Sequence, residues 1–168
     1  MPAGPVEVVV EIVRLQSTEL RRLRELRLRS LEDAPEAFSS TYAETAARPE
    51  ESWRQQLLSL PTFVAVVDGG DEGIVRGCPA DQDASAAYLI SMWVSPRARG
   101  RGVGEALIQA LIAWARREGY ERLILDVGDH NSHAIALYAR LGFEPTGQVS
   151  VLPAPHDHVR EHERVLWL

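Results

Sequence analysis

The chain has 168 residues, 45% hydrophobic and 25% charged, and this balance predicts a single globular domain over residues 1–168 with one substantial core. The formal net charge of −6 argues against nucleic acid as the main partner, because binding a phosphate backbone needs a densely basic surface. A single cysteine excludes a disulfide framework, and the lack of a long apolar run or a secretory signal pattern predicts a cytoplasmic protein without membrane contact.

The first elements expected are a strand and an amphipathic helix. The apolar run from Val6 to Val13 predicts the strand. Ser17 or Thr18 can cap the helix that follows, in which leucines recur on one face, and Pro35 ends it.

Three further segments lead to a hairpin. Residues 36–48 predict a loop with room for a short helix, and Glu50 to Leu60 predict a third helical stretch. Phe63 to Val67 is apolar and rich in β-branched residues, which predicts a strand, and Asp68 to Gly70 predict the turn after it.

The return strand of this hairpin is less regular. Gly73 to Cys78 predict a strand, but Pro79 and the polar run from Ala80 to Ser85 predict its interruption. Ala87 to Val94 then predict a buried strand that ends before Pro96.

A glycine-rich turn follows this strand. Residues 99–104 have the sequence Arg-Gly-Arg-Gly-Val-Gly, and the residues after them place apolar side chains on one helical face. Glycines at a helix start let backbone N–H groups approach a ligand closely, and the helix N-terminus favours an anion. Arg99 and Arg101 add full positive charges. The turn therefore predicts a site for a phosphate-bearing ligand at residues 99–105.

Two nucleotide-binding patterns do not fit this turn. The dinucleotide fingerprint needs a third glycine, and counting from Gly100 gives Glu105 at that position. The phosphate loop of nucleotide triphosphatases needs Gly-Lys-Ser or Gly-Lys-Thr, and the region has no lysine. A nucleotide-dependent enzyme is thus kept only as an alternative.

A second pattern comes one helix and one strand later. Arg122 to Val127 alternates in a way that predicts a strand with different surroundings on its two faces. Asn131, Tyr138 and Gly142-Phe143 follow, and Gly142 suits the left-handed position that ends a helix.

The spacing Arg99-x-x-Gly102-x-Gly104, followed by the pattern from Asn131 to Phe143, resembles the two signatures of the GNAT superfamily, the acyl-CoA-dependent N-acetyltransferases. The resemblance covers about residues 60–145. It implies an α/β fold with a mixed, twisted sheet of six or seven strands that splays at its centre, with helices on both faces. It also implies transfer of an acetyl group from acetyl-CoA to a primary amine, on a small molecule or a peptide, by direct attack in a ternary complex.

The resemblance implies a donor site made mainly of main chain. The turn would bind the CoA diphosphate, and the pantetheine arm would lie between two splayed strands that end near Val94 and near Val127. A backbone N–H would stabilise the oxyanion formed on attack. The residues implied in donor binding are Met92, Trp93, Val94, Arg99, Gly100, Arg101, Gly102, Val103, Gly104, Glu105 and Asn131. Asn131 can also cap the helix that follows it.

Tyr138 matches the family position whose phenol lies beside the donor sulfur. A phenol can donate a proton to a developing thiolate held within hydrogen-bond reach. The resemblance therefore implies that Tyr138 is the general acid for the CoA thiolate, and a packing role on a short helix is the alternative.

The group that removes the amine proton is left open. Glu44, Asp126 and, less directly, His130 or His133 are candidates, and a solvated surface position is the alternative for each. The resemblance gives residues 36–57 and 150–162 as the segments that shape the acceptor pocket.

The end of the chain predicts two strands, at about 145–152 and 163–168, joined by a proline- and histidine-rich hairpin. The histidines of this hairpin lack a supporting cysteine, so no metal is expected. The two strands could pair with a second copy and give a homodimer. The side chains expected to be packing residues are Cys78, Trp93 and Trp114. A non-catalytic acyl-CoA-binding or regulatory module is the alternative function.

Overall fold

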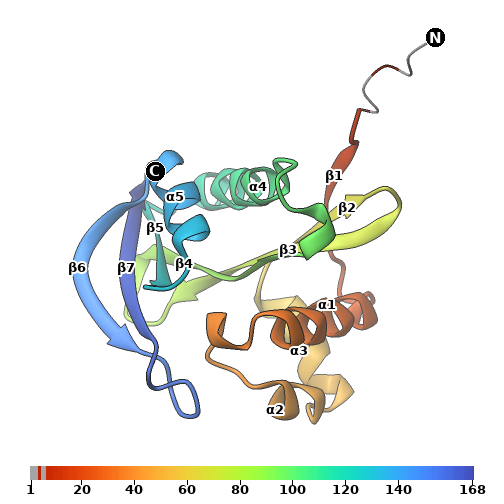
Figure 1. The fold of residues 1–168 in the computed structure, drawn as a ribbon, viewed down its shortest axis with the longest axis horizontal. Coiled ribbons are helices and arrows are strands. Elements are labelled where there is room, and N and C mark those ends of the chain that lie inside the picture. Colours follow the sequence, from red (N-terminus) through yellow and green to blue (C-terminus); the bar gives the residue numbers. More distant parts are fainter. Residues whose placement is uncertain (1–3, 5–6) are drawn as a thin grey trace.

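The computed structural model describes Gly4 and residues 7–168, which form a seven-stranded sheet with helices on both faces (Figure 1). The strands are β1 (Val10–Arg14), β2 (Thr62–Val67), β3 (Gly70–Ala80), β4 (Asp83–Val94), β5 (Arg122–Gly128), β6 (Glu144–Val151) and β7 (Arg160–Trp167). Their order across the sheet is β1-β2-β3-β4-β5-β7-β6, and only the β4–β5 pair is parallel. The predicted mixed α/β sheet is confirmed.

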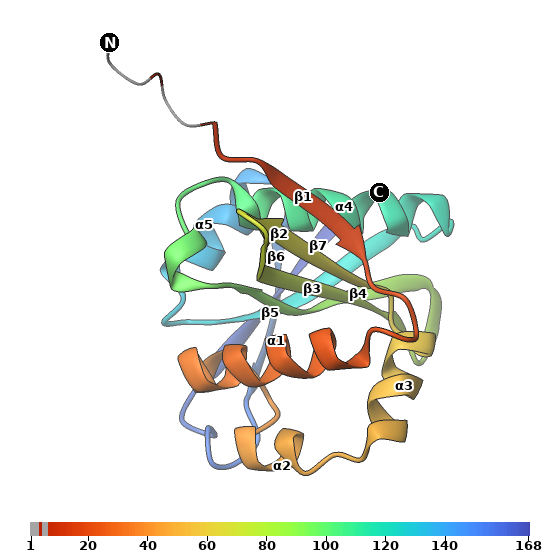
Figure 2. The ribbon, with the colours of Figure 1, turned by 90° about the vertical axis from the view of Figure 1, so that its right-hand side faces the viewer.

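The helices form two layers. Figure 2 shows α4 on one side of the sheet and α1 on the other, with α5 beside α4, and α2 and α3 on the same side as α1. The bounds are α1 (Leu20–Asp33), α2 (Tyr42–Ala46), α3 (Glu50–Ser59), α4 (Val103–Arg117) and α5 (Ser132–Arg140), with 3-10 turns η1 (Pro35–Ala37) and η2 (Pro96–Ala98). Each layer encloses its own buried cluster, and we call the two sides of the sheet the α4 face and the α1 face.

The sheet opens between its two parallel strands. Only Ala86 to Tyr88 of β4 pair with β5, at Arg122 to Ile124. Beyond these residues β4 continues to Val94 paired with β3, and β5 continues to Gly128 paired with β7. The two strands therefore diverge, which confirms the predicted central splay.

The β3–β4 hairpin corrects one prediction. Both strands are continuous, so Pro79 and the polar residues after it do not interrupt them. β2 pairs with β3 only as far as Arg76, and Gly77 N donates to Pro61 O at 2.9 Å. Two residues further on, no described strand pairs with β3 on that side, so Pro79 occupies an open edge where an N–H donor is not needed. The polar run forms the turn, in which Asp83 accepts bonds from Ser85.

The first residues of the chain correct two further predictions. β1 begins at Val10, opposite Val67, because β2 ends there and offers no earlier partner. Val6 lies outside the described residues. Neither Ser17 nor Thr18 caps α1: Glu19 holds the cap position with no side-chain cap bond, and its carboxylate accepts the Gln16 N–H at 2.7 Å.

The C-terminal strands lie at one edge of the sheet. β6 is the last strand, and every residue in it is exposed, including Val149 and Val151. Such an edge fits pairing with a second copy, and the homodimer stays a prediction. Among the residues described, no helix combines the length and apolar character needed to cross a membrane.

Candidate active site

The glycine turn presents a row of free backbone amides. Within the described residues, the N–H groups from Gly100 to Glu105 donate to no other backbone group, and the first amide of α4 to do so is that of Ala106, to Gly102 O at 3.0 Å. No side chain caps α4 at Gly102. Free amides at the start of a 15-residue helix favour an anion beside them.

Glycine is needed in this turn for two different reasons. Gly100 and Gly102 both have φ of +76°, a left-handed conformation that other residues adopt only with strain. Gly104 is needed for space, because a Cβ there would lie 3.1 Å from Leu137 Cδ2 and 3.3 Å from Met92 Cε. The start of α4 is thus packed closely against α5 and β4.

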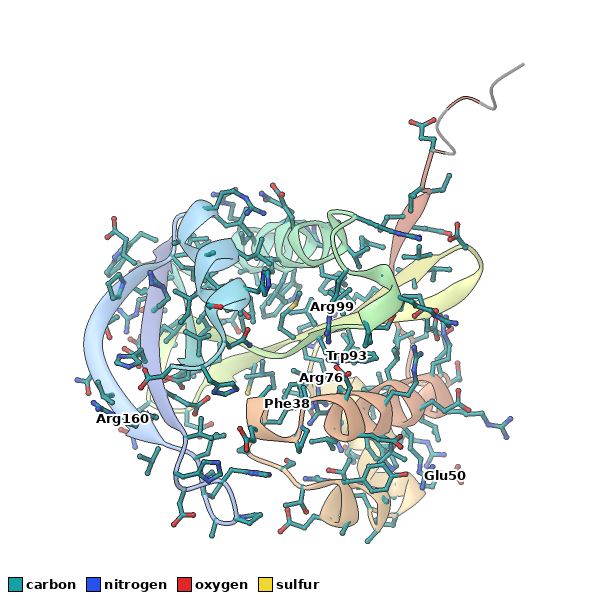
Figure 3. All side chains as sticks on the ribbon, viewed as in Figure 1. Phe38, Glu50, Arg76, Trp93, Arg99 and Arg160 are labelled. Atoms are coloured by element: carbon teal, nitrogen blue, oxygen red, sulfur yellow. The ribbon has the colours of Figure 1, made fainter. Side chains whose placement is uncertain are left out.

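The two arginines of the turn differ in their contacts. Arg99 donates from Nη2 to Asp33 Oδ2 at 2.6 Å and from Nε to Val94 O at 3.0 Å. Trp93 Nε1 donates to the same Asp33 oxygen at 2.9 Å, which joins β4 and the turn to α1 (Figure 3). Arg101 makes only a 3.4 Å contact with Asp68 and is the freer of the two for a phosphate.

Glu72 holds the segment that leads into the glycine turn. Its buried carboxylate accepts hydrogen bonds from Ser95 and Arg97, just before the turn, and from Arg29 Nη2 of α1 at 3.1 Å. Burial alone would raise the pKa of Glu72, but these donors outweigh burial and hold the pKa below its usual range. Glu72 therefore stays ionised and fixes the approach to α4.

A cavity of about 430 Å³ lies beside the turn on the α1 face. Its walls include Trp93, Asp33 and Arg29, and the Arg29 guanidinium lies 5.3 Å from the Trp93 ring centroid. Trp93 is buried, as predicted, and Trp114 is buried in the α4 cluster. The side chains of Met92 and Val94 face α4, next to Gly104.

Tyr138 lies in the buried cluster of the α4 face that also contains Val127 of β5. Its ring packs edge-on against Phe143 with centroids 5.7 Å apart. Burial alone raises the pKa of the phenol, so the hydroxyl stays protonated well above neutral pH.

Asn131 has the structural role expected of it. It holds the N-cap position of α5, and its side-chain oxygen accepts the Ala134 N–H at 3.2 Å. Gly142 has φ of +98°, which confirms the predicted left-handed exit from this helix. These two residues fix the ends of the helix that carries Tyr138.

The strand register gathers acidic side chains on the α1 face of the splay. Leu123, Leu125 and Val127 belong to the α4 cluster, so Asp126, between them in the alternation, points the other way. Asp126 pairs with Glu163 of β7, and Glu161 lies opposite Gly128. Burial, and then the Glu163 carboxylate, raise the pKa of Asp126, and burial, followed by Asp126, raises that of Glu161. Among the described residues, none of these three carboxylates forms an ion pair with a cationic side chain.

The other candidate bases have simpler roles. Glu44 forms a capping box with Thr41: the Thr41 hydroxyl accepts the Glu44 N–H and the Glu44 carboxylate accepts the Thr41 N–H. His130 and His133 are exposed, at the β5–α5 connection and the start of α5. Of the candidates, Asp126 alone combines a raised pKa with a place on the splayed strand.

The segments expected to shape the acceptor pocket touch each other. His158 Nε2, in the hairpin between β6 and β7, lies 3.1 Å from Glu36 Oε1 in η1. His162 contacts Asp129, and the rings of His156 and His158 are 6.2 Å apart. Within residues 4 and 7–168, no group of three or more His, Cys, Asp or Glu residues is placed to hold a metal.

Sequence reasoning missed several residues that the fold brings to this site. Asp33 and Glu72 come from outside both motifs, and no local pattern marks them. Glu161 and Glu163 join Asp126 only through the β5–β7 pairing.

The chain is similar to known acetyltransferases in sequence and in fold. The model of the acetyltransferase (GNAT) family matches residues 21–143. The mycothiol acetyltransferase of Salinispora arenicola is 35% identical over 127 residues, which cover 70% of this chain and 39% of that protein. N-acetyltransferase 8 of Homo sapiens is 34% identical over 79 residues, 45% of this chain and 35% of that protein. The chain thus spans only about two fifths of the length of these curated relatives.

Two solved structures share the fold over nearly their whole length. The ribosomal-protein-alanine N-acetyltransferase from Brucella melitensis has a TM-score of 0.76 at 25% identity, covering 94% of this chain and 99% of that one. The yncA protein of Salmonella typhimurium, solved with its cofactor acetyl-CoA, has a TM-score of 0.77 at 22% identity, covering 95% of this chain and 94% of that one. With the sheet, the splay and the glycine turn described above, the family match shows that the chain belongs to the acetyltransferase (GNAT) family.

Proposed function

We propose that this chain transfers an acetyl group from acetyl-CoA to a primary amine, by direct attack of the amine while both are bound. The observation that carries the proposal is the row of free amides from Gly100 to Glu105 at the end of a strand that splays from its neighbour. The acceptor enters from the α1 face and the donor lies along the splay.

The donor site fits a diphosphate with a long arm. The free amides and the positive end of α4 favour the diphosphate, and Arg101 adds charge beside them. Past Tyr88, β4 has no β5 neighbour among the described residues, so the backbone groups between Met92 and Val94 that point away from β3 face the splay, where a pantetheine arm can bond them; Val94 O already accepts from Arg99 Nε. Acetyl-CoA supplies the activated acetyl group, and the backbone holds its carbonyl for attack.

Tyr138 is proposed to donate to the sulfur as the C–S bond breaks. Its pKa is raised by burial, so it carries the proton throughout the neutral range. The proton passes from the phenol to the departing thiolate, and solvent returns one to the phenol, so the products are the N-acetyl amine and the CoA thiol.

The acceptor reaches the site as an ammonium ion and must lose a proton before it attacks. Asp126 is proposed to receive that proton, directly or through water. The uncompensated negative charge of Asp126, Glu161 and Glu163 favours a cationic group at this place. A carboxylate with a raised pKa is also a stronger base.

The direct test follows free thiol while acetyl-CoA is mixed with a library of primary amines. The proposal predicts amine-dependent thiol release with an N-acetyl product of matching amount. Stoichiometric binding of acetyl-CoA without turnover on any amine would instead identify an acyl-CoA-binding module. If NAD or ATP raises the unfolding temperature and acetyl-CoA does not, the donor assignment is wrong.

A further inference from the structure

Two arginine side chains are buried on the α1 face without an anionic partner in the part of the chain that the structure describes. Arg27 of α1 is 5% exposed and Arg76 of β3 is 6% exposed. Neither forms an ion pair with any acidic residue in the described ranges. A buried charge without a counter-charge is unfavourable, so its presence needs an explanation.

The hydrogen-bond partners of both guanidinium groups are neutral. Arg76 donates from Nη1 to Gln56 Oε1 at 2.7 Å, and from Nε and Nη2 to Ser91 Oγ at 3.0 and 2.9 Å. Arg27 makes one long contact, from Nη1 to Ser30 Oγ at 3.5 Å, and lies 5.0 Å from the Phe38 ring centroid. These contacts orient the two groups without neutralising them.

A comparison within α1 shows how unusual this is. Arg22 is bound by Asp71 and Glu19, and Asp71 above all raises the pKa of its guanidinium. Burial instead lowers the pKa of Arg27 to about 10, and Arg48 adds to the effect. Burial, followed by Arg27 and Arg48, lowers that of Arg76 to about 9. Both groups remain charged at neutral pH and repel each other.

The unused donors of Arg27 remain accessible to a ligand. The polar side-chain atoms that are sealed from solvent and lack a partner, among the described residues, are Thr45 Oγ1, Trp53 Nε1 and Arg164 Nε. Nε and Nη2 of Arg27 have no partner either, yet they are not among the sealed atoms. One edge of this guanidinium therefore reaches a space that water can enter, while its face lies under Phe38.

The location is the acceptor side of the splay. Arg76 pairs with Ile90 across β3 and β4, and Ser91, which its guanidinium bonds, follows the point where β4 leaves β5. Ser91 has φ of +56° and so marks an irregularity in β4 there. Figure 3 shows Arg76 and Phe38 between the sheet and α1. The acidic side chains of β5 and β7 lie on the same face, on the other side of the splay.

We infer that the acceptor amine carries a carboxylate, as an amino acid does, and that the free edge of Arg27 binds it while the neighbouring Arg76 adds positive charge. A guanidinium edge with two parallel N–H donors matches the two oxygens of a carboxylate. The anion would neutralise the buried arginines while the ammonium group faces the acidic side chains. The inference rests on the proposed function, and it adds the charge pattern of the substrate.

The test compares acceptors that differ only in the carboxylate. Thiol release is measured with a panel of amino acids, their α-carboxamides and the amines left by decarboxylation, at constant ionic strength. We expect kcat/KM to be about tenfold or more higher for the carboxylates. Arg27→Gln should remove that preference by raising KM for the carboxylates, and leave the carboxamides within about twofold. Arg21→Gln, exposed on the same helix, should change neither.

Binding is read separately from turnover. Amino acids should raise the unfolding temperature of the wild-type chain more than their carboxamides do, and Arg27→Gln should abolish the difference. Equal kcat/KM and equal stabilisation for carboxylates and carboxamides in the wild type would overturn the inference, even if the variant failed to fold. Equal losses for both acceptors in a folded Arg27→Gln chain would also overturn it, because they indicate a structural role. Failure of the proposed function looks different: acetyl-CoA would give no stabilisation and no acceptor would release thiol, while the carboxylate-dependent shift could still be measured.

Discussion

The proposed donor side and the proposed acceptor side of the splay are built from different chemical groups. On the donor side, a short continuous segment supplies backbone amides between Gly100 and Glu105, and the side chains around them mainly set the shape of the turn. On the acceptor side, charged side chains come from α1, β3, β5 and β7. A backbone site recognises one constant group, whereas a side-chain site can be changed residue by residue.

The two sides meet at the buried carboxylate of Glu72 and at Asp33. Each of them accepts hydrogen bonds from the segment that leads into α4, and Glu72 also binds Arg29 of α1. A movement of α1 would therefore change the position of the glycine turn. Substitutions can separate the sides or show that they act together.

The largest effect is expected from the donor side. Tyr138→Phe should lower kcat about a hundredfold, because general-acid help to the thiolate is lost, and leave the affinity for acetyl-CoA nearly unchanged. Thiol release and calorimetric titration measure the two quantities. Tyr120→Phe, whose ring packs on Trp114, is the control and should keep full activity. Unchanged kcat in Tyr138→Phe would leave Tyr138 only its packing role.

The next largest effect is expected at Glu72, where the two sides meet. Glu72→Gln should lower the free energy of unfolding by about 2 kcal/mol at neutral pH, because the bonds that the carboxylate accepts from Arg29 and Arg97 lose their charge. The folded-state pKa of Glu72 is lowered, so its contribution is present above the unfolded pKa of about 4.3 and is lost as pH falls through the folded value. Denaturant titrations of both chains should therefore converge at acid pH.

Asp71→Asn is the matched control for this prediction. Asp71 also binds an arginine of α1, but on a more exposed surface, so its loss should be less than about 1 kcal/mol. If the Glu72→Gln chain is as stable as Asp71→Asn, or if its difference from wild type grows at acid pH, the ionised Glu72 carboxylate does not stabilise the fold as proposed.

A smaller effect separates backbone strain at the glycine turn from binding of acetyl-CoA by its amides. Gly102→Ala and Gly119→Ala both place a Cβ at a left-handed glycine, with φ of +76° and +83° and open space around it. Each should lose about 1 kcal/mol of stability. Gly102→Ala should also weaken acetyl-CoA binding about tenfold, since the amides move as the strain relaxes, and Gly119→Ala should not. Equal affinities in calorimetry would remove Gly102 from the donor site.

The smallest effect is on the acceptor side. The folded-state pKa of Asp126 is raised, so its ionised form opposes folding above the unfolded pKa, and protonation relieves this as pH falls. Asp126→Asn should therefore stabilise the chain at neutral pH by a few tenths of a kcal/mol, because solvent screens the group, and the gain should vanish near pH 4. Lower stability at neutral pH would mean that Asp126 has a favourable partner.

The backbone conformation of the proposed donor side could be predicted from the sequence because its information is local. The glycines from Gly100 to Gly104, the cap at Asn131 and the exit at Gly142 each set a backbone conformation through their own residue type. The mixed sheet and its central splay followed from the family resemblance that these motifs carry. The hairpin was mispredicted at Pro79, since the absence of a β2 neighbour there is a property of the assembled sheet.

The acceptor side could not be predicted in the same way. Asp126 and Glu163 are 37 positions apart and become neighbours only through the β5–β7 register. Arg76 stands in a strand whose pattern gives no sign that Gln56 and Ser91 will enclose it. Such pairs arise from tertiary packing, which a single sequence does not show.

The most direct test of the central claim compares the affinities of acetyl-CoA and S-acetyl-pantetheine for the full chain by calorimetry. If the amides between Gly100 and Glu105 bind the diphosphate, the analogue that lacks it should bind about a hundredfold more weakly or worse. Equal affinity for the two compounds, or no heat with acetyl-CoA at millimolar concentration, would contradict the account.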